Sequence, residues 1–269
     1  MDKAFPRPRK ALGQNFLNDR NIINKILNAA QLSADDSVLE VGPGRGALTE
    51  LLAERAGRLV AVEFDRDLAA MLKGRFADNS RVHLHEQDIL KVDFESLLGD
   101  DKFKVVANLP YNISTPLLFR FLDERSRFSR LVVMLQKEVG KRLVAPPDCS
   151  DYGILSLLFQ QWFDIRLEFT VSPGCFFPVP KVDSVVISLT PLCASRVDVG
   201  KQQLFERLVR SAFAMRRKTL WNCLKSAGLG TADTVEKALY ECGIEPERRG
   251  ETLSMEEFGR LSVKLSDCS

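Results

Sequence analysis

Paired cysteines, histidine clusters and long apolar runs are missing from this 269-residue sequence. Its six cysteines are scattered without a Cys-x-x-Cys pair, and its only two histidines are His83 and His85. Neither a metal site nor a disulfide framework is therefore expected, and reduced thiols fit the cytosol. The two histidines share one face of a strand pattern and are expected to be ordinary strand residues.

The sequence also lacks the apolar segments that direct a chain to or through a membrane. Its first residues, MDKAFPRPRKALGQNFL, carry prolines and charges where a signal peptide has an apolar core. No apolar run approaches the length that spans a bilayer. We therefore expect a cytoplasmic protein with no membrane partner.

A large net charge is absent as well, since the formal net charge is +2 and the isoelectric point is near 8.2. This balance is too mild by itself to identify nucleic acid as the partner. Basic residues nevertheless gather near the start, between Arg125 and Arg142, and at Arg216, Arg217 and Lys218. Each cluster taken alone is equally compatible with an ordinary solvated surface.

Short apolar runs alternate with helical patterns through the first two thirds of the chain, which predicts an α/β fold with a mostly parallel, doubly wound sheet. The runs expected to be strands are 37–41, 58–63, 82–85, 103–107 and 131–135. The stretches expected to be helices between them include 47–56, 67–76 and 115–122.

The pattern changes after an expected helix at 152–163. Two β-rich runs, 164–171 and 182–189, flank a proline-rich segment and predict an antiparallel pair at the edge of the sheet. From about Lys201 onward only helices are expected. Their ranges are 203–213, 218–227, 234–242 and 255–265. This organisation predicts a large domain at 1–195 and a small, all-helical domain at 196–269.

A glycine-rich turn follows the first of the parallel strands. In VLEVGPGRGALTELL, residues Gly42, Gly44 and Gly46 stand between the strand and a helix, where glycine lets the backbone turn tightly and approach a ligand. The spacing Gly42-x-Gly44-x-x-Ala47 also satisfies a loose dinucleotide fingerprint. An NAD-dependent oxidoreductase is therefore one alternative at this point, although no residue is placed to handle a hydride substrate.

Polar side chains end the next three strands. Glu63 lies one strand-helix-strand unit after the glycines, where a carboxylate can accept both hydroxyls of a ribose. Asp88 ends the third strand and Asn108 the fourth. Each acid alone could be a turn residue or a helix N-cap, but together the three line one crevice beside the glycines, and a nucleoside fits such a crevice.

Six ordered segments carry a resemblance to a known family. They are GQNFL (13–17), EVGPGRGALT (40–49), VEFD (62–65), QDIL (87–90), NLPYN (108–112) and FFPVPKVDS (176–184). Together they resemble the ribosomal RNA adenine N6-dimethyltransferase family from about Lys10 to the last helices. KALGQNFL, NLPYN and VDSVVISLTP look more like the housekeeping branch, which modifies two adjacent adenines near the 3′ end of small-subunit (16S) rRNA, than like the macrolide-resistance branch, which acts on large-subunit rRNA.

The resemblance implies a Rossmann-like class I methyltransferase domain, with S-adenosylmethionine as cofactor and methyl donor. It implies that Asn15 and Leu17 close over this cofactor from the N-terminal segment, although the residue pattern alone favours a helix cap and a core leucine there. It places Gly42 under the amino-acid part of the cofactor, with Gly44 in the same turn. It assigns Glu63 to the ribose and Asp88 to the adenine ring.

The run VANLPYN (106–112) fits chemistry on an adenine amine, a poor nucleophile because its lone pair is delocalised into the ring. Two acceptors aimed at its protons favour the form whose lone pair is free to attack. The side-chain oxygen of Asn108 is one acceptor, and the backbone carbonyl of Leu109, whose direction Pro110 fixes, is the second. Positioning and exclusion of water then replace acid-base catalysis, so no Ser-His-Asp set or carboxylate pair is expected.

A target base must leave its stack to reach the methyl group, and a flipped base needs a flat surface. The resemblance assigns one face to Tyr111 and the other to Phe176, whereas Phe177 is expected to be core. The basic residues Arg216, Arg217 and Lys218 are candidate RNA phosphate contacts beside an apolar helical stripe.

The expected partner is small-subunit rRNA within an immature 30S particle, met by a monomer during ribosome biogenesis. Two further alternatives stay open: a large-subunit rRNA methyltransferase, and a non-catalytic RNA-binding assembly or accessory factor that keeps the fold and the cofactor pocket.

Overall fold

The computed structural model describes residues 6–9, 12–215 and 217–267. The chain divides into two compact units, the first formed by residues 1–140 and 165–191 and the second by 141–164 and 192–269. The chain passes from one unit to the other three times, and the last passage, between residues 191 and 192, lies four residues before the domain boundary expected after residue 195. The second unit, however, also takes in 141–164, a segment that the sequence had assigned to the large domain.

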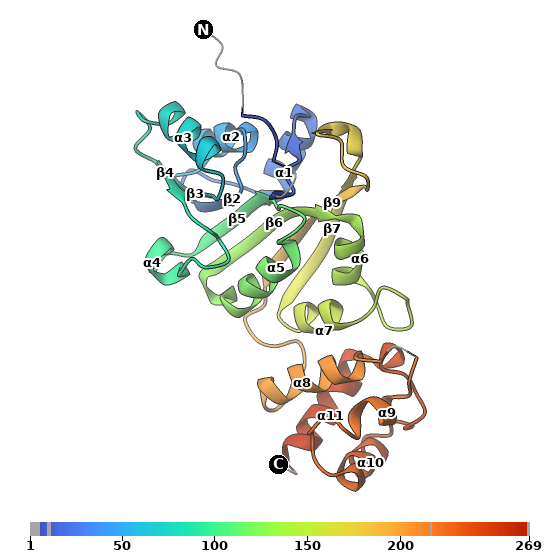
Figure 1. Ribbon diagram of the computed structural model, residues 1–269. Coiled ribbons are helices and arrows are strands. Elements are labelled where there is room, and N and C mark those ends of the chain that lie inside the picture. The colour runs from blue at the N-terminus through green and yellow to red at the C-terminus, as the bar shows by residue number, and fades with distance from the viewer. Residues whose placement is uncertain (1–5, 10–11, 216, 268–269) are drawn as a thin grey trace. The chain divides into compact units, whose positions relative to one another are not determined.

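A mixed sheet forms the centre of the first unit (Figure 1). Within the described residues it has seven strands in the order β4-β3-β2-β5-β6-β9-β7. Their bounds are β2 Ser37–Val41, β3 Arg58–Glu63, β4 Val82–Glu86, β5 Phe103–Asn108, β6 Phe128–Gln136, β7 Phe163–Val171 and β9 Ser184–Pro191. The order reverses between β2 and β5, and such a switch point opens a crevice at the carboxyl ends of the strands.

The strand pairings follow the expected directions. β2 pairs in parallel with β3 and β5, and β5 pairs in parallel with β6. β9 runs antiparallel to β6, with Leu131 opposite Leu189 and Gln136 opposite Ser184. The central strands are buried on both faces, which explains why they are near-continuous runs of Val, Leu and Ala.

Helices α1 Arg20–Ala30, α2 Ala47–Arg55 and α3 Arg66–Arg75 flank the strands at the start of the chain. α1 begins at the N-cap Asp19, whose side chain accepts hydrogen bonds from the amides of Asn21 and Ile22. Its buried face contributes Ile23, Ile26 and Leu27 to a core shared with α2 and the strands. The remaining helices of this unit are α4 Phe94–Leu98 and α5 Ser114–Asp123, followed by the 3₁₀ turn η2 Arg125–Arg127.

A second, two-stranded sheet joins distant parts of the first unit. β1 Phe16–Leu17 pairs antiparallel with β8 Phe176–Phe177, which follows the 3₁₀ turn η3 Pro173–Cys175. Phe16 lies opposite Phe177, and Leu17 lies opposite Phe176. This pair ties the N-terminal segment to the proline-rich loop that precedes β9.

The second unit is helical. It contains α7 Ile154–Gln160, α8 Gln202–Ala212, α9 Leu220–Leu224, α10 Ala232–Glu241, the 3₁₀ turn η4 Gly250–Thr252 and α11 Met255–Asp267. The rings of Phe213 and Phe258 stack 6.2 Å apart, and Tyr152 donates a hydrogen bond to the carbonyl of Leu253 at 3.0 Å. Helix α6 Lys137–Val144 begins in the first unit and ends in the second.

The α/β architecture expected from the sequence is confirmed, as is the helical character of the C-terminal region. Expected helices at 152–163 and 218–227 are shorter in the structure, because α7 ends at Gln160 and α9 at Leu224. A search of the described residues for a helix long and apolar enough to cross a bilayer returns no candidate.

Candidate active site

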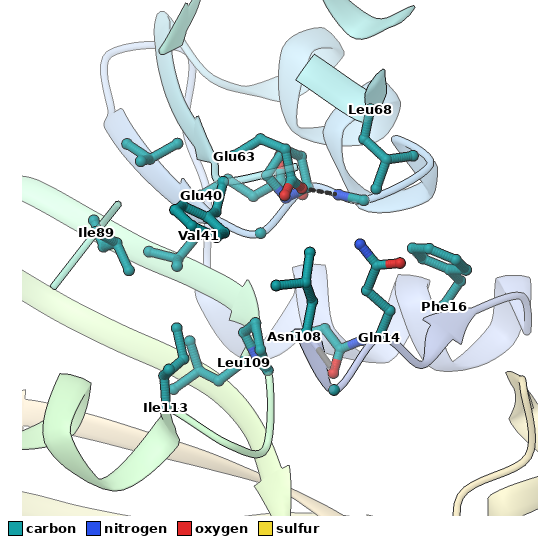
Figure 2. Close-up of a pocket in the computed structure, with 18 of the residues that line it drawn as sticks. Gln14, Phe16, Glu40, Val41, Glu63, Leu68, Ile89, Asn108, Leu109 and Ile113 are labelled. Atoms are coloured by element: carbon teal, nitrogen blue, oxygen red, sulfur yellow. Dashed lines mark hydrogen bonds between the residues drawn. The ribbon is translucent and has the colours of Figure 1, made fainter. Parts of the chain in front are cut away.

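One cavity of the first unit gathers most of the residues that the sequence singles out. Glycine-turn, strand-end and N-terminal residues line it together: Asn15, Leu17, Gly42, Gly44, Glu63, Asp88, Asn108, Leu109, Pro110 and Tyr111. Figure 2 shows how the strand ends and the N-terminal segment face one another across this space. It lies where the strand order reverses, the position at which open α/β sheets bind ligands.

The glycine-rich turn has a left-handed backbone at Gly42 and Gly44, and at Gly44 it approaches a neighbouring ring closely enough to exclude a larger residue. Gly44 has a φ of +59°, and a Cβ atom there would lie 2.9 Å from Cδ1 of Phe16. Gly42 has a φ of +65°, and its added Cβ would lie 3.4 Å from Cγ of Pro110. Both positions therefore favour glycine for conformation, and the turn is in contact distance of the N-terminal segment and the Asn108 loop.

Glu63 at the end of β3 holds the glycine turn in place. One carboxylate oxygen accepts the amide of Gly44 at 3.0 Å, and the other accepts the amide of Asp65 at 2.9 Å. Burial raises the pKa of Glu63, against the lowering effect of these backbone hydrogen bonds. Each carboxylate oxygen has a second lone pair, so the group can still accept hydroxyl protons from a ligand in the cavity.

Glu40 is a cavity residue to which the sequence analysis gave no role. It lies on β2 with only 2% of its surface exposed, and burial, with the nearby Glu63 carboxylate adding to it, raises the pKa of Glu40 to about 8. Its Oε2 has no hydrogen-bond partner among the described residues. A buried oxygen without a partner at a cavity wall fits a ligand that brings a donor. The signal in the sequence was a carboxylate inside an apolar strand.

Asp88 follows β4 and organises the turn after it. Its Oδ1 accepts the amide of Leu90 at 3.0 Å, and its carbonyl accepts the amides of Lys91 and Val92 at 2.8 and 3.1 Å. Asp88, Ile89 and Leu90 all line the cavity. The turn therefore presents one carboxylate and two apolar side chains, a combination that suits the edge and face of a flat heterocycle.

Asn108 joins the end of β5 to the N-terminal segment. Its Nδ2 donates to the backbone carbonyl of Asn15 at 3.0 Å. Because a carbonyl can only accept, this bond fixes the orientation of the amide and leaves Oδ1 as the atom that can accept from a ligand. The amide of Leu109 donates to the carbonyl of Met134 at 3.0 Å, which anchors the loop to β6.

Tyr111 is held by its hydroxyl group. Its Oη and Oγ of Ser184 are 2.5 Å apart, and burial raises the pKa of this phenol despite the hydrogen bond. The hydrogen bond connects the NLPYN segment to β9, the strand that begins just after the proline-rich loop. Tyr111 is half-buried and lines the cavity. Its place beside a flipped base stays a prediction.

The two phenylalanines of the proline-rich loop exchange the places expected from the sequence. Phe176 is 3% exposed and belongs to the core formed with α1 and α2, whereas Phe177 is 50% exposed. Side chains alternate along a strand, and in β8 it is Phe176 that enters the core beside Leu17. The expectation that Phe176 offers an open ring face and that Phe177 is core is therefore wrong for this structure.

The N-terminal segment lies along the cavity and is bonded to the start of α3. Gln14 donates to Oδ2 of Asp65 at 2.9 Å and accepts the amide of Arg9 at 2.7 Å. Arg9 pairs with Asp65 at 3.4 Å and with Asp67 at 2.5 Å. Leu17 is 6% exposed and belongs to the core as well as to the cavity wall. The core leucine is confirmed, and its contact with the cofactor stays a prediction. The helix cap, by contrast, is Asp19 and not Asn15.

The basic cluster of the second unit is only partly described. Arg216 lies outside the described residues. Arg217 and Lys218 are exposed, just before α9. A search of the described residues for three or more grouped His, Cys, Asp or Glu ligands gives no metal site.

Fold and cavity together define a Rossmann-like α/β protein with a ligand cavity at the carboxyl ends of its parallel strands. Comparisons with known proteins then narrow this class. The sequence profile described as ribosomal RNA adenine dimethylase matches residues 6–266, and the chain belongs to this family. It is an S-adenosylmethionine-dependent methyltransferase, which overturns the oxidoreductase alternative.

Two relatives are similar over nearly their whole length. The chain is 59% identical to the ribosomal RNA small subunit methyltransferase A of Geobacter metallireducens, over 95% of this chain and 94% of that protein. It is 46% identical to the protein of the same name from Clostridium botulinum, over 96% and 93%.

Two solved structures are also similar. A dimethyladenosine transferase from Plasmodium falciparum superposes with a TM-score of 0.82 at 27% identity, over 94% of this chain and 98% of that one. The 23S rRNA methyltransferase ErmE superposes with a TM-score of 0.71 at 26% identity, over 94% and 100%.

Proposed function

We propose that this protein transfers methyl groups from S-adenosylmethionine to N6 of two adjacent adenines near the 3′ end of small-subunit rRNA, giving N6,N6-dimethyladenine. The observation that carries the proposal is the Asn108 loop at the cavity, in which the amide oxygen of Asn108 is the atom left to accept. Identity of 59% to a small subunit methyltransferase, against 26% to a large-subunit enzyme, supports the small-subunit assignment.

The cavity residues fit the cofactor. Glu63 offers carboxylate lone pairs for the ribose hydroxyls, and the turn at Asp88 offers a carboxylate and apolar side chains for the adenine. The buried Oε2 of Glu40 and the glycine turn at Gly42 and Gly44 stand at the wall where the amino-acid part is assigned. Asn15 and Leu17 cover the cavity from the N-terminal side. When bound, S-adenosylmethionine supplies a methyl group carried on a positively charged sulfur.

The Asn108 loop prepares the adenine amine for attack. Oδ1 of Asn108 and the backbone carbonyl of Leu109 accept hydrogen bonds from its two N–H groups, and Pro110 fixes the direction of that carbonyl. The amine lone pair is then directed away from the ring, and no ionised base has to remove a proton beforehand. The nitrogen becomes positively charged as it takes the methyl group and gives up one proton afterwards. Tyr111, anchored through Ser184, supports one face of the flipped base. Rate comes from positioning and from exclusion of water.

Arg217 and Lys218 are proposed contacts to RNA phosphates, together with Arg216. The proposed substrate is the rRNA of an immature 30S particle, met in the cytoplasm by a monomer during ribosome biogenesis. What supports the two phosphate contacts is that the side chains of Arg217 and Lys218 are exposed just before α9.

The test is to incubate the purified protein with immature 30S particles, with 50S particles and with a labelled methyl donor, and to map the product by primer extension. Two adjacent stops near the 3′ end of small-subunit rRNA are expected, and the 50S arm stays unlabelled. Label confined to large-subunit rRNA would favour the resistance branch. Absence of dimethyladenine at every salt concentration would favour the non-catalytic assembly factor.

A further inference from the structure

Arg120, on the middle of α5, holds the backbone turn that follows β4. Its Nη1 donates to the carbonyl of Ile89 and its Nη2 to the carbonyl of Val92, both at 2.5 Å. The guanidinium also lies over the ring of Phe94, 4.6 Å from its centroid. One half-buried side chain thus spans the whole turn from Asp88 to the start of α4.

The turn that Arg120 holds is the one that carries Asp88. Inside the turn, the Asp88 carboxylate and carbonyl accept the amides of the three residues Leu90, Lys91 and Val92. The carbonyls of Ile89 and Val92, in contrast, accept hydrogen bonds from the guanidinium of Arg120. Ile89 and Leu90 line the cavity beside Asp88, so Arg120 supports the cavity wall from behind without lining the cavity itself.

Helix α5 connects this support to the Asn108 loop. Residues 108–113 line the cavity and α5 begins at Ser114, whose hydroxyl donates to the carbonyl of Tyr111 at 3.2 Å. The packing of Phe121 against Phe128 of β6, with ring centroids 5.3 Å apart, fixes the helix on the sheet. The same helix therefore begins at the end of the Asn108 loop, and about two turns later its Arg120 side chain binds the Asp88 turn.

We propose that Arg120 is a positioning residue that fixes the Asp88 turn against α5 and so sets the affinity for the adenosine part of the cofactor. This inference rests on the proposed contact between Asp88 and the adenine. Arginine suits the task because its planar fork reaches two carbonyls at once, whereas lysine offers a single charged centre.

A neighbouring arginine supplies the matched control. Arg127, in η2, donates to Glu124 at 2.8 Å, to Glu95 at 3.2 Å and to the carbonyl of Gly99 at 3.4 Å. Like Arg120, it joins the end of its own element to residues in or next to α4. None of the residues that Arg127 contacts lines the cavity. Replacing it removes a comparable set of hydrogen bonds away from the Asp88 turn.

The experiment measures binding of S-adenosylhomocysteine by calorimetry to the full-length variants Arg120→Gln, Arg120→Lys and Arg127→Gln. Arg120→Gln is expected to weaken binding by about tenfold, because two charge-assisted hydrogen bonds are lost. Arg120→Lys, which keeps the charge and supports the fold, is expected to recover part of this loss. Arg127→Gln is expected to bind within about twofold of the wild type.

Methylation assays separate positioning from general damage. In Arg120→Gln the KM for S-adenosylmethionine rises, while kcat at saturating cofactor and the KM for RNA stay near the wild-type values. An Arg127→Gln loss as large as that of Arg120→Gln, or unchanged binding in Arg120→Gln, would overturn the proposal.

A double-mutant cycle with Asp88→Ala tests whether Arg120 affects cofactor binding through the Asp88 turn. If Arg120 acts through the Asp88 turn, Arg120→Gln has much less effect in the Asp88→Ala background than in the wild type. Equal effects in both backgrounds would overturn the positioning role, even where the role of Asp88 holds. Unchanged binding in Asp88→Ala alone would instead overturn the assignment of Asp88 to the adenine, and the Arg120 proposal with it.

Discussion

At the scale of single residues, Asn108 performs two tasks with one amide group. Its nitrogen donates to the Asn15 carbonyl of the N-terminal segment, and its oxygen is the proposed acceptor for the adenine amine. A side chain with either a donor or an acceptor alone could not do both. One residue therefore links the N-terminal segment that lies over the cavity to the proposed acceptor for the adenine amine.

Asn108→Ala is expected to lower kcat by about 10²-fold, because the amine loses an acceptor that orients it. RNA affinity, measured by filter binding, is expected to stay within about twofold of the wild type, since Asn108 contributes no charge to phosphate binding. Asn28→Ala, at an exposed residue of α1 that does not line the cavity, serves as the control. Full methylation activity in Asn108→Ala would contradict the proposed mechanism.

Glu40 makes the stability of the protein depend on pH. With a folded-state pKa of about 8 against an ordinary value of 4.5, its carboxyl keeps a proton in the folded chain that the unfolded chain releases. Folding therefore binds a proton between these two values. Stability contributed by the protonated form is full below about pH 4.5 and is lost as the pH rises through about 8.

Glu40→Gln, which cannot ionise, is expected to flatten this dependence, whose slope reaches about 1.4 kcal/mol per pH unit in the wild type. Urea unfolding at pH 5, 6, 7 and 8 measures the free energy of unfolding of both proteins. Glu54→Gln makes the same substitution on the exposed side of α2 and is expected to keep the wild-type slope. If the free energy of unfolding depends on pH with the same slope in the wild type and in Glu40→Gln, Glu40 is not neutral in the folded state.

At the scale of elements, the N-terminal segment is held over the cavity by bonds that differ in burial. Gln14 donates at 2.9 Å to Asp65, which is 2% exposed. Arg9 is itself 51% exposed: its contact with Asp65 is longer, at 3.4 Å, and its pair with Asp67 is exposed on both sides. Exposed ion pairs contribute little to stability, while a hydrogen bond to a buried carboxylate contributes more. Gln14 is therefore the stronger attachment.

Gln14→Ala is expected to speed the dissociation of S-adenosylhomocysteine by about fivefold, because the cover opens more often. Stopped-flow displacement measures the rate, and Arg9→Gln in 150 mM salt is expected to change it by less than about twofold. Equal acceleration by both variants would show that Arg9 holds the segment as firmly as Gln14.

The length and periodicity of the secondary-structure elements explain which parts of the site could be predicted from the sequence. Strands of the parallel sheet are continuous apolar runs, and their polar last residues, such as Glu63 and Asn108, meet at one edge. The β1–β8 pair could not be predicted, because two-residue strands have no periodicity and this pair joins residues about 160 positions apart. Without that pairing, nothing in the sequence decides whether Phe176 or Phe177 enters the core.

At the scale of the whole molecule, RNA affinity is expected to depend on salt through the basic side chains of the second unit. Replacing Arg217 or Lys218 by Gln is expected to reduce the slope of log K against log salt by about 1 for each lost phosphate contact. The control is Lys237→Gln on α10, where the lysine is 3.8 Å from Glu241. Unchanged slopes in Arg217→Gln and Lys218→Gln would remove these residues from the proposed RNA surface.

The division into units has a consequence for dissecting the chain. Sequence patterns place the boundary at 195, because helices and strands up to that point alternate as in one α/β domain. The structure groups 141–164 with the C-terminal helices, since Tyr152 bonds to Leu253 and its ring lies 6.0 Å from that of Phe213. Contacts between residues so far apart in the chain leave no local pattern in the sequence.

A fragment of residues 1–195 is therefore expected to expose apolar side chains that α8 and the later helices cover in the full chain. Tyr152, which is 6% exposed, loses its hydrogen-bond partner and its aromatic neighbour in this fragment. Binding of a hydrophobic dye and self-association in size-exclusion chromatography are the expected results. Full-length Tyr152→Phe, which loses only the hydrogen bond, is expected to elute as the wild type does and to lose about 1 kcal/mol of stability. A monomeric 1–195 fragment that binds no dye would mean that 141–164 folds with the first unit.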